Sequence, residues 1–183
     1  SLDDGEWLIP VGEISAGSRL VALGGTDSFS EVSLPRLALV AEPSPDFDSS
    51  TINVTPLTTL LSNTDPSEHS DILERLGIDS SPEDIFSSDF WSLAIGGDDE
   101  AANIQRLNAI VGMNALAFDA VAGAGDDSAL SNAEVFAKAM SDAALSVNDP
   151  TDLSSSVTIE AIMTSALSDT SLSDTVDQST VQT

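Results

Sequence analysis

The spacing of the hydrophobic residues changes within residues 51–61, TINVTPLTTLL. Ile52 and Val54 alternate with polar neighbours, which is the pattern of a half-buried strand. Thr55 and Pro56 then form a helix start, with threonine as the N-cap and proline at the first helical position. The leucines that follow fall on one helix face. This stretch predicts a strand that leads directly into a helix, and it divides a β-rich first part from a helical remainder.

Before this junction, short apolar clusters are separated by glycine and proline, which is typical of strands joined by turns. Their spacing predicts an antiparallel sheet of four or five strands. So small a sheet needs a second layer to cover its apolar face, and the helices that follow can supply it. The clusters lie at residues 7–9, 20–23, 37–41 and 52–54.

Several helix starts follow the junction. The tetrapeptides DPSE at 65–68 and SPED at 81–84 each place a capping residue before proline and follow it with acidic residues. The longest helix is predicted at 98–122, with three acidic residues in its first turn, where they complement the helix dipole. The capping box SNAE at 131–134 predicts another helix, and a last one is predicted at 157–167.

These patterns together predict an α+β fold, with a small N-terminal antiparallel β-sheet packed on a C-terminal bundle of about four or five helices. We expect residues 1–55 to form the sheet unit and residues 56–167 to form the helical unit packed on it. Residues 168–183 are rich in serine, threonine and aspartate, so they are expected to be a polar tail or linker.

Charge is the outlying property of the composition. The 183 residues include 31 acidic and five basic side chains, which gives a net charge of −26. Such a surface repels the phosphates of nucleic acids and of anionic lipids, so neither is expected as a partner. No apolar run approaches the roughly 20 residues that span a bilayer, and membrane insertion is not expected. Because the charges also repel one another, we expect salt or divalent cations to stabilise the fold.

Cysteine is absent, which excludes disulfides, thiolate metal sites and cysteine nucleophiles. The absence also fits the exterior of a bacterium. Together with the acidic charge, it favours an extracellular or cell-surface location in a saline setting.

The sequence LVALGGTD at 20–27, combined with NVTPLTTL at 53–60, resembles a segment of very large secreted bacterial surface proteins. These are repeat-rich, adhesin-like polypeptides that carry cadherin-like, immunoglobulin-like or calcium-binding repeats. The resemblance covers roughly residues 18–122 and implies an extracellular, non-catalytic module. It supplies no functional residues, and this chain lacks the glycine- and aspartate-rich nonapeptide calcium repeats.

The resulting functional hypothesis is a structural or adhesive module of a bacterial extracellular surface assembly. Its expected partners are other copies of itself or neighbouring domains of a larger surface protein. One physical route is strand addition, in which an exposed sheet edge accepts an extended segment of the next copy. Residues 7–10 and 175–181 are candidates for that segment.

Calcium is the one ion for which the chain offers candidate ligands. Asp126, Asp127 and Glu134 place carboxylates in and beside a glycine-rich loop, and calcium prefers six to eight oxygen ligands. The EF-hand template fails, because its sixth and twelfth positions, counted from Asp126, are Ser131 and Ala137. An irregular calcium site and a solvated acidic loop are the alternatives.

Phe90 and Trp91 lie in a stretch, 89–93, that is ambiguous between an extended link and a helical turn. With Trp7, they could form a platform on which a sugar ring stacks. The competing interpretation is that these tryptophans fill the junction between sheet and helices, because aromatic side chains dominate core energetics. The second functional hypothesis is therefore a calcium- or carbohydrate-binding module of an adhesin or of a secreted polysaccharide-acting protein.

Enzyme activity is not expected. His69 is the single histidine, no G-x-S-x-G nucleophile motif is present, and a solvated helical histidine accounts for it. A hydrolase cleft normally surrounds its carboxylates with aromatic and basic residues, whereas tyrosine is absent here and cations are few. The sequence therefore assigns no catalytic residue and no cofactor other than a possible calcium ion.

Overall fold

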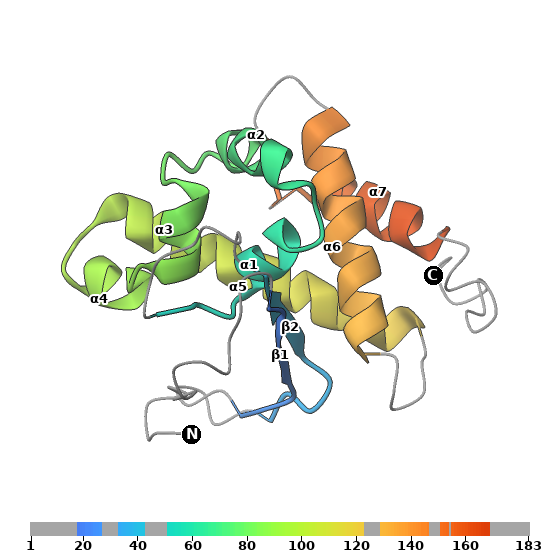
Figure 1. Cartoon of the computed structure of the whole chain (residues 1–183). Helices are drawn as coiled ribbons and strands as arrows, with labels where there is room; N and C mark the ends of the chain where they lie inside the picture. The colour runs from blue at the N-terminus through green and yellow to red at the C-terminus, as the bar shows by residue number, and fades with distance from the viewer. Residues whose placement is uncertain are drawn as a thin grey trace.

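The computed structural model describes residues 18–26, 33–42, 51–122, 129–146, 151–153 and 155–168. Within these ranges the chain forms two strands, seven α-helices and one short 3-10 helix (Figure 1). The expected α+β fold is confirmed, with the small antiparallel sheet near the N-terminus and the helices after it. The seven α-helices exceed the expected four or five, and three of the seven are short helices of six residues.

The sheet has two strands, β1 (Leu20–Leu23) and β2 (Ala38–Ala41), paired antiparallel from Leu20–Ala41 to Leu23–Ala38. Gly24 directly follows β1, and its φ of 66° is unfavourable for residues with a side chain. A Cβ atom there would also lie 3.1 Å from the carbonyl oxygen of Pro35.

The expected four or five strands are therefore reduced to two in the described part of the chain. The apolar cluster at 7–9 lies outside it, and the cluster at 52–54 forms no strand. Asn53 explains the second difference, because its backbone N–H donates to the carbonyl of Phe86 at 2.6 Å. Its side-chain Nδ2 donates to the carbonyls of Ile85 and Ser88 at 3.1 and 2.9 Å. The segment thus pairs with the end of a helix rather than with the sheet.

Helix α1 (Pro56–Leu61) begins where the sequence predicts. Thr55 is the N-cap and accepts a hydrogen bond from the backbone N–H of Thr58, whose hydroxyl accepts one from the N–H of Thr55. The helix lies at the centre of the molecule, among β2, α5 and α6 (Figure 1). Its three leucines are fully buried.

Four further short elements follow: the 3-10 helix η1 (Pro66–Glu68), α2 (His69–Arg75), α3 (Pro82–Ser87) and α4 (Phe90–Ile95). Both helix starts predicted from proline are confirmed, with Asp65 and Ser81 as the caps. The ambiguous stretch at 89–93 is helical, because Asp89 caps the N-terminus of α4 by accepting from the N–H of Ser92.

The long helices are α5 (Asp99–Ala122), α6 (Ala129–Ser146) and α7 (Ser156–Leu167). The capping box predicted at 131–134 is wrong, because α6 already begins at Ala129 and these residues lie within its first turns. α5 passes behind α1, and α6 packs against both α5 and α7 (Figure 1). The rings of Phe118 in α5 and Phe136 in α6 meet with centroids 5.6 Å apart.

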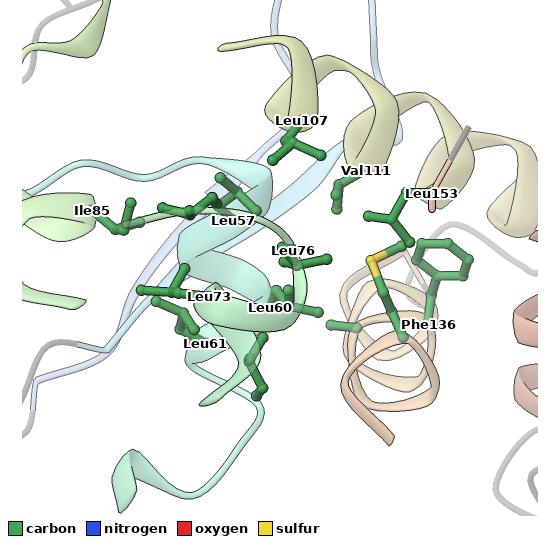
Figure 2. Packing of buried hydrophobic residues seen from close by; sticks show 14 of the residues in the cluster. Leu57, Leu60, Leu61, Leu73, Leu76, Ile85, Leu107, Val111, Phe136 and Leu153 are labelled. Atoms are coloured by element: carbon green, nitrogen blue, oxygen red, sulfur yellow. The ribbon is translucent and has the colours of Figure 1, made fainter. Parts of the chain in front are cut away.

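One hydrophobic cluster connects these elements, from Ala41 in β2 to Leu167 in α7. Figure 2 shows the leucines of α1 gathered with side chains from α2, α5 and α6 around a common centre. α1 therefore joins the sheet to the helical layer, as its sequence suggests. The labelled members are Leu57, Leu60, Leu61, Leu73, Leu76, Ile85, Leu107, Val111, Phe136 and Leu153.

Candidate functional site

The two adjacent aromatic residues of α4 have different environments. Phe90 is 8% exposed and belongs to the core, whereas Trp91 is 57% exposed. Successive residues of a helix point about 100° apart, so a helix that buries Phe90 turns Trp91 outward. The interpretation of Trp91 as core filling is therefore wrong. Trp7 lies outside the described residues.

Trp91 borders a shallow pocket of about 130 Å³ at the junction of the 53–55 segment, the 88–91 stretch and α5. Trp91 supplies the exposed apolar surface of this pocket, whereas Ile85, Phe90 and Ile104 form its buried floor. The same pocket is lined by several polar side chains, namely Asn53, Thr55, Ser88, Asp89, Gln105 and Asn108.

The polar side chains of the pocket differ in how far they are already engaged. The side-chain Nδ2 of Asn53 donates both of its hydrogen bonds to backbone carbonyls. The Oδ1 of Asn108 accepts from the N–H of Leu57 at 3.0 Å. The Nδ2 of Asn108 and the whole amide of Gln105 have no hydrogen-bond partner among the described residues. Hydrogen bonds from Ser92 hold the pKa of the Asp89 carboxyl below its usual value, so the group is ionised at neutral pH.

The three candidate calcium ligands are not brought together in the described part of the chain. Asp126 and Asp127 lie outside it, and Glu134, on α6, is paired with the guanidinium of Arg19. Among the residues with described positions, no group of three acidic or histidine side chains is placed to hold a metal. A calcium site at this loop stays a prediction from the sequence.

His69 is buried, so its interpretation as a solvated helical residue is wrong. Its Nε2 lies 2.8 Å from the carbonyl oxygen of Leu61, which identifies Nε2 as the protonated nitrogen. The ring thereby ties the start of α2 to the end of α1. Its role in this structure is structural.

The outer edge of β2 is closed by hydroxyl groups from α1 and the residue after it. The backbone N–H of Val40 donates to Oγ1 of Thr59 at 2.8 Å, and Oγ1 of Thr58 lies 2.9 Å from the Val40 carbonyl. The N–H of Glu42 donates to the hydroxyl of Ser62 at 2.8 Å. These hydroxyl groups satisfy backbone N–H and C=O groups that a further strand would otherwise have to pair with.

The outer edge of β1 has no such cover from the described residues. The bond from the N–H of Gly24 to the carbonyl of Leu37 fixes which backbone groups face β2. Hydrogen-bonded and non-hydrogen-bonded residue pairs alternate along an antiparallel ladder, so the backbone N–H and C=O groups of Val21 and Leu23 point away from β2. They make no hydrogen bond to another described residue, and their side chains are 43% and 64% exposed.

A polar network that the sequence did not reveal joins the turn before β2 to α5 and α6. Arg36 donates to both carboxylate oxygens of Asp119, at 2.6 and 2.8 Å, and Nδ2 of Asn132 donates to the same carboxylate at 2.8 Å. Burial raises the pKa of Asp119, but the hydrogen bonds from Arg36 and Asn132 and the Arg36 charge outweigh it, so the pKa lies below its usual value. The network holds the sheet against the helices.

Comparisons with protein-family models, with curated proteins and with solved structures give no match to this chain. In the part of the chain with described positions, none of the helices has an apolar stretch long enough to span a bilayer.

Proposed function

We propose that this protein is a structural or adhesive module of a bacterial extracellular surface assembly, and that it associates with other copies by strand addition at β1. The observation that carries the proposal is the contrast between the two edges of the sheet. α1 and Ser62 close the edge of β2, whereas no described residue closes the edge of β1. An open edge of this kind is a template for another strand.

Charge supports another copy of the chain as the source of that strand. A chain with a net charge of −26 repels its copies over most of its surface. Residues 18–26, SRLVALGGT, contain no acidic residue and include Arg19. β1 itself therefore brings no carboxylate to β1 of a second copy. The nearby Glu134 carboxylate is neutralised by its pair with Arg19, and the exposed Val21 and Leu23 side chains would be covered.

The extracellular location rests on the absence of cysteine, the acidic charge and the resemblance of residues 20–27 and 53–60 to secreted surface proteins. Screening by salt would reduce the repulsion between copies, so association is expected to be stronger in seawater-like salt than at low ionic strength.

Light scattering at both ionic strengths tests the proposal with a matched pair of variants. Leu23→Lys places a charge beside the open edge, where lysine opposes pairing, and Ile95→Lys places the same charge on α4 at a residue that is 73% exposed. The wild type and Ile95→Lys are expected to associate in salt, and Leu23→Lys is expected to stay monomeric. A wild type that is monomeric in both salts would overturn the proposal.

Two further variants identify the strand that is added. Val21→Pro removes an N–H that faces away from β2, so it should block edge pairing while leaving the β1–β2 bonds in place. Deletion of residues 168–183 removes the segment 175–181, which is the other candidate donor. If the deletion leaves association unchanged, β1 itself or residues 7–10 supplies the strand.

A further inference from the structure

We propose that the pocket beside Trp91 binds one unit of a neutral saccharide, with the indole ring as the stacking surface. This binding function is additional to association through β1 and uses a different part of the molecule.

The exposure of Trp91 is the first observation. The chain has two tryptophans, and this one leaves more than half of its surface in water on a helix whose other aromatic residue is buried. A flat indole face offers a pyranose ring an apolar surface against which its C–H groups pack. Phe90 and Ile104 lie beneath the pocket and are 8% and 0% exposed, so the indole ring is the apolar surface that a ligand would meet.

The uncommitted amides are the second observation. Gln105 has no hydrogen-bond partner among the described residues, and Asn108 keeps its Nδ2 as a free donor. Because Oδ1 of Asn108 is fixed by the N–H of Leu57 at the start of α1, the side chain is already ordered before a ligand arrives. Planar amides of this kind match the neighbouring hydroxyl groups of a sugar, which both donate and accept.

Asp89 supplies an acceptor with a fixed charge. Its Oδ1 is held by the N–H of Ser92 at 2.9 Å, and its lowered pKa keeps the group ionised. A carboxylate accepts hydrogen bonds from sugar hydroxyls more strongly than a neutral oxygen does. The aromatic face, the free amides and the carboxylate together supply the contacts that recognise a polyhydroxylated ring.

Charge and size define the ligand class. No basic residue lines the pocket, Asp89 is anionic and the whole chain carries −26, so sulfated and uronate sugars are repelled. The volume of about 130 Å³ is well below the roughly 300–1,000 Å³ of pockets that enclose drug-sized ligands. The site therefore holds one ring of a neutral chain, and its affinity for a single chain is low.

A protein partner is the competing occupant, because Leu93 and Ile95 on the same helix are also exposed. The saccharide is favoured because Leu93 and Ile95 do not line the pocket, whereas Gln105, Asn108 and Asp89 do.

Saturation-transfer NMR with the full chain tests the proposal. The probes are cellohexaose, mannohexaose and chitohexaose, with oligomannuronate as the anionic comparison. At least one neutral probe is expected to bind saturably, whereas oligomannuronate is expected not to bind. Trp91→Ala is expected to weaken it by about tenfold or more, and Gln105→Ala by several-fold. Ile95→Ala is the matched control, because it removes an exposed apolar side chain of α4 outside the pocket.

Three results would overturn the proposal. The first is no saturable binding of any neutral probe, and the second is equal binding by Trp91→Ala and the wild type. The third is an altered oligomeric state of Trp91→Ala without any sugar effect, which would identify a protein contact. Trp91 and Gln105 are not core residues, so thermal unfolding curves should show that both variants stay folded. Leu23→Lys is expected to bind the sugar normally, which separates this proposal from association at β1.

Discussion

At the scale of single residues, Asp119 stands apart because it is the one buried acidic residue in the described part of the chain. It is 6% exposed and receives hydrogen bonds from Arg36 and Asn132. Asp119→Asn should destabilise the fold by about 2 kcal/mol, because hydrogen bonds to a charged group contribute roughly 1.5–3 kcal/mol. Urea unfolding of the variant and the wild type measures the difference.

The pH dependence of that difference follows from the direction of the pKa shift. Since the folded pKa of Asp119 is lowered, its stabilisation is fully present above the unfolded value of about 3.9. It is lost as the pH falls through the folded pKa, so the wild type and Asp119→Asn should converge in acid. Asp142→Asn is the control, because Asp142 is an exposed partner of Lys138 and such a pair contributes little. A difference that does not depend on pH would contradict this account.

Residues whose role depends on a distant partner could not be recognised from the sequence. The Thr55 cap was predictable because its partner, Thr58, lies three residues away. Arg36 and Asp119 are 83 residues apart, and nothing in their local sequence indicates that they meet. The interpretation of His69 as solvated fails although its partner is only eight residues away, because a position within a helix does not show that the Leu61 carbonyl lies beside the ring.

At the scale of elements, the attachment of β2 to α1 gives a second prediction. Thr59→Val keeps the shape of a side chain that is 5% exposed but removes the acceptor for the N–H of Val40, which is fully buried. A buried donor left unpaired costs about 1–3 kcal/mol, and that loss is expected in urea unfolding. Thr64→Val is the matched control, because the Thr64 hydroxyl donates to carbonyls that also accept backbone N–H groups. Equal losses in the two variants would refute the proposed role of Thr59.

The elements that were predicted well are those whose signals are local. Proline and a capping side chain mark the starts of α1, η1 and α3, and all three are confirmed. The strand expected at 52–54 failed because alternation does not show what an extended segment pairs with, and Asn53 binds the end of α3. The pocket beside Trp91 shows the same limit. The sequence singled out its aromatic residues, but Gln105 and Asn108 join them only through the packing of α4 on α5.

At the scale of the whole molecule, charge repulsion should dominate the response to salt. The Arg19–Glu134 and Lys138–Asp142 ion pairs are substantially exposed, so salt weakens contacts that contribute little to stability. It screens a net charge of −26, since the Debye length falls to about 10 Å at 0.1 M. The melting temperature should therefore rise with sodium chloride and level off once the charges are screened. Sodium sulfate at equal ionic strength is the control, because stabilisation by ion exclusion depends on the anion and keeps raising the melting temperature as the salt concentration increases.

Calcium gives a second test of the charge. If screening is the whole effect, calcium chloride at matched ionic strength should raise the melting temperature as much as sodium chloride does. A saturable extra rise with calcium would instead indicate a specific site, for which Asp126, Asp127 and Glu134 are the first residues to replace. In that case Glu134 would have to exchange its contact with Arg19 for the ion, and Glu134→Gln should abolish the extra rise.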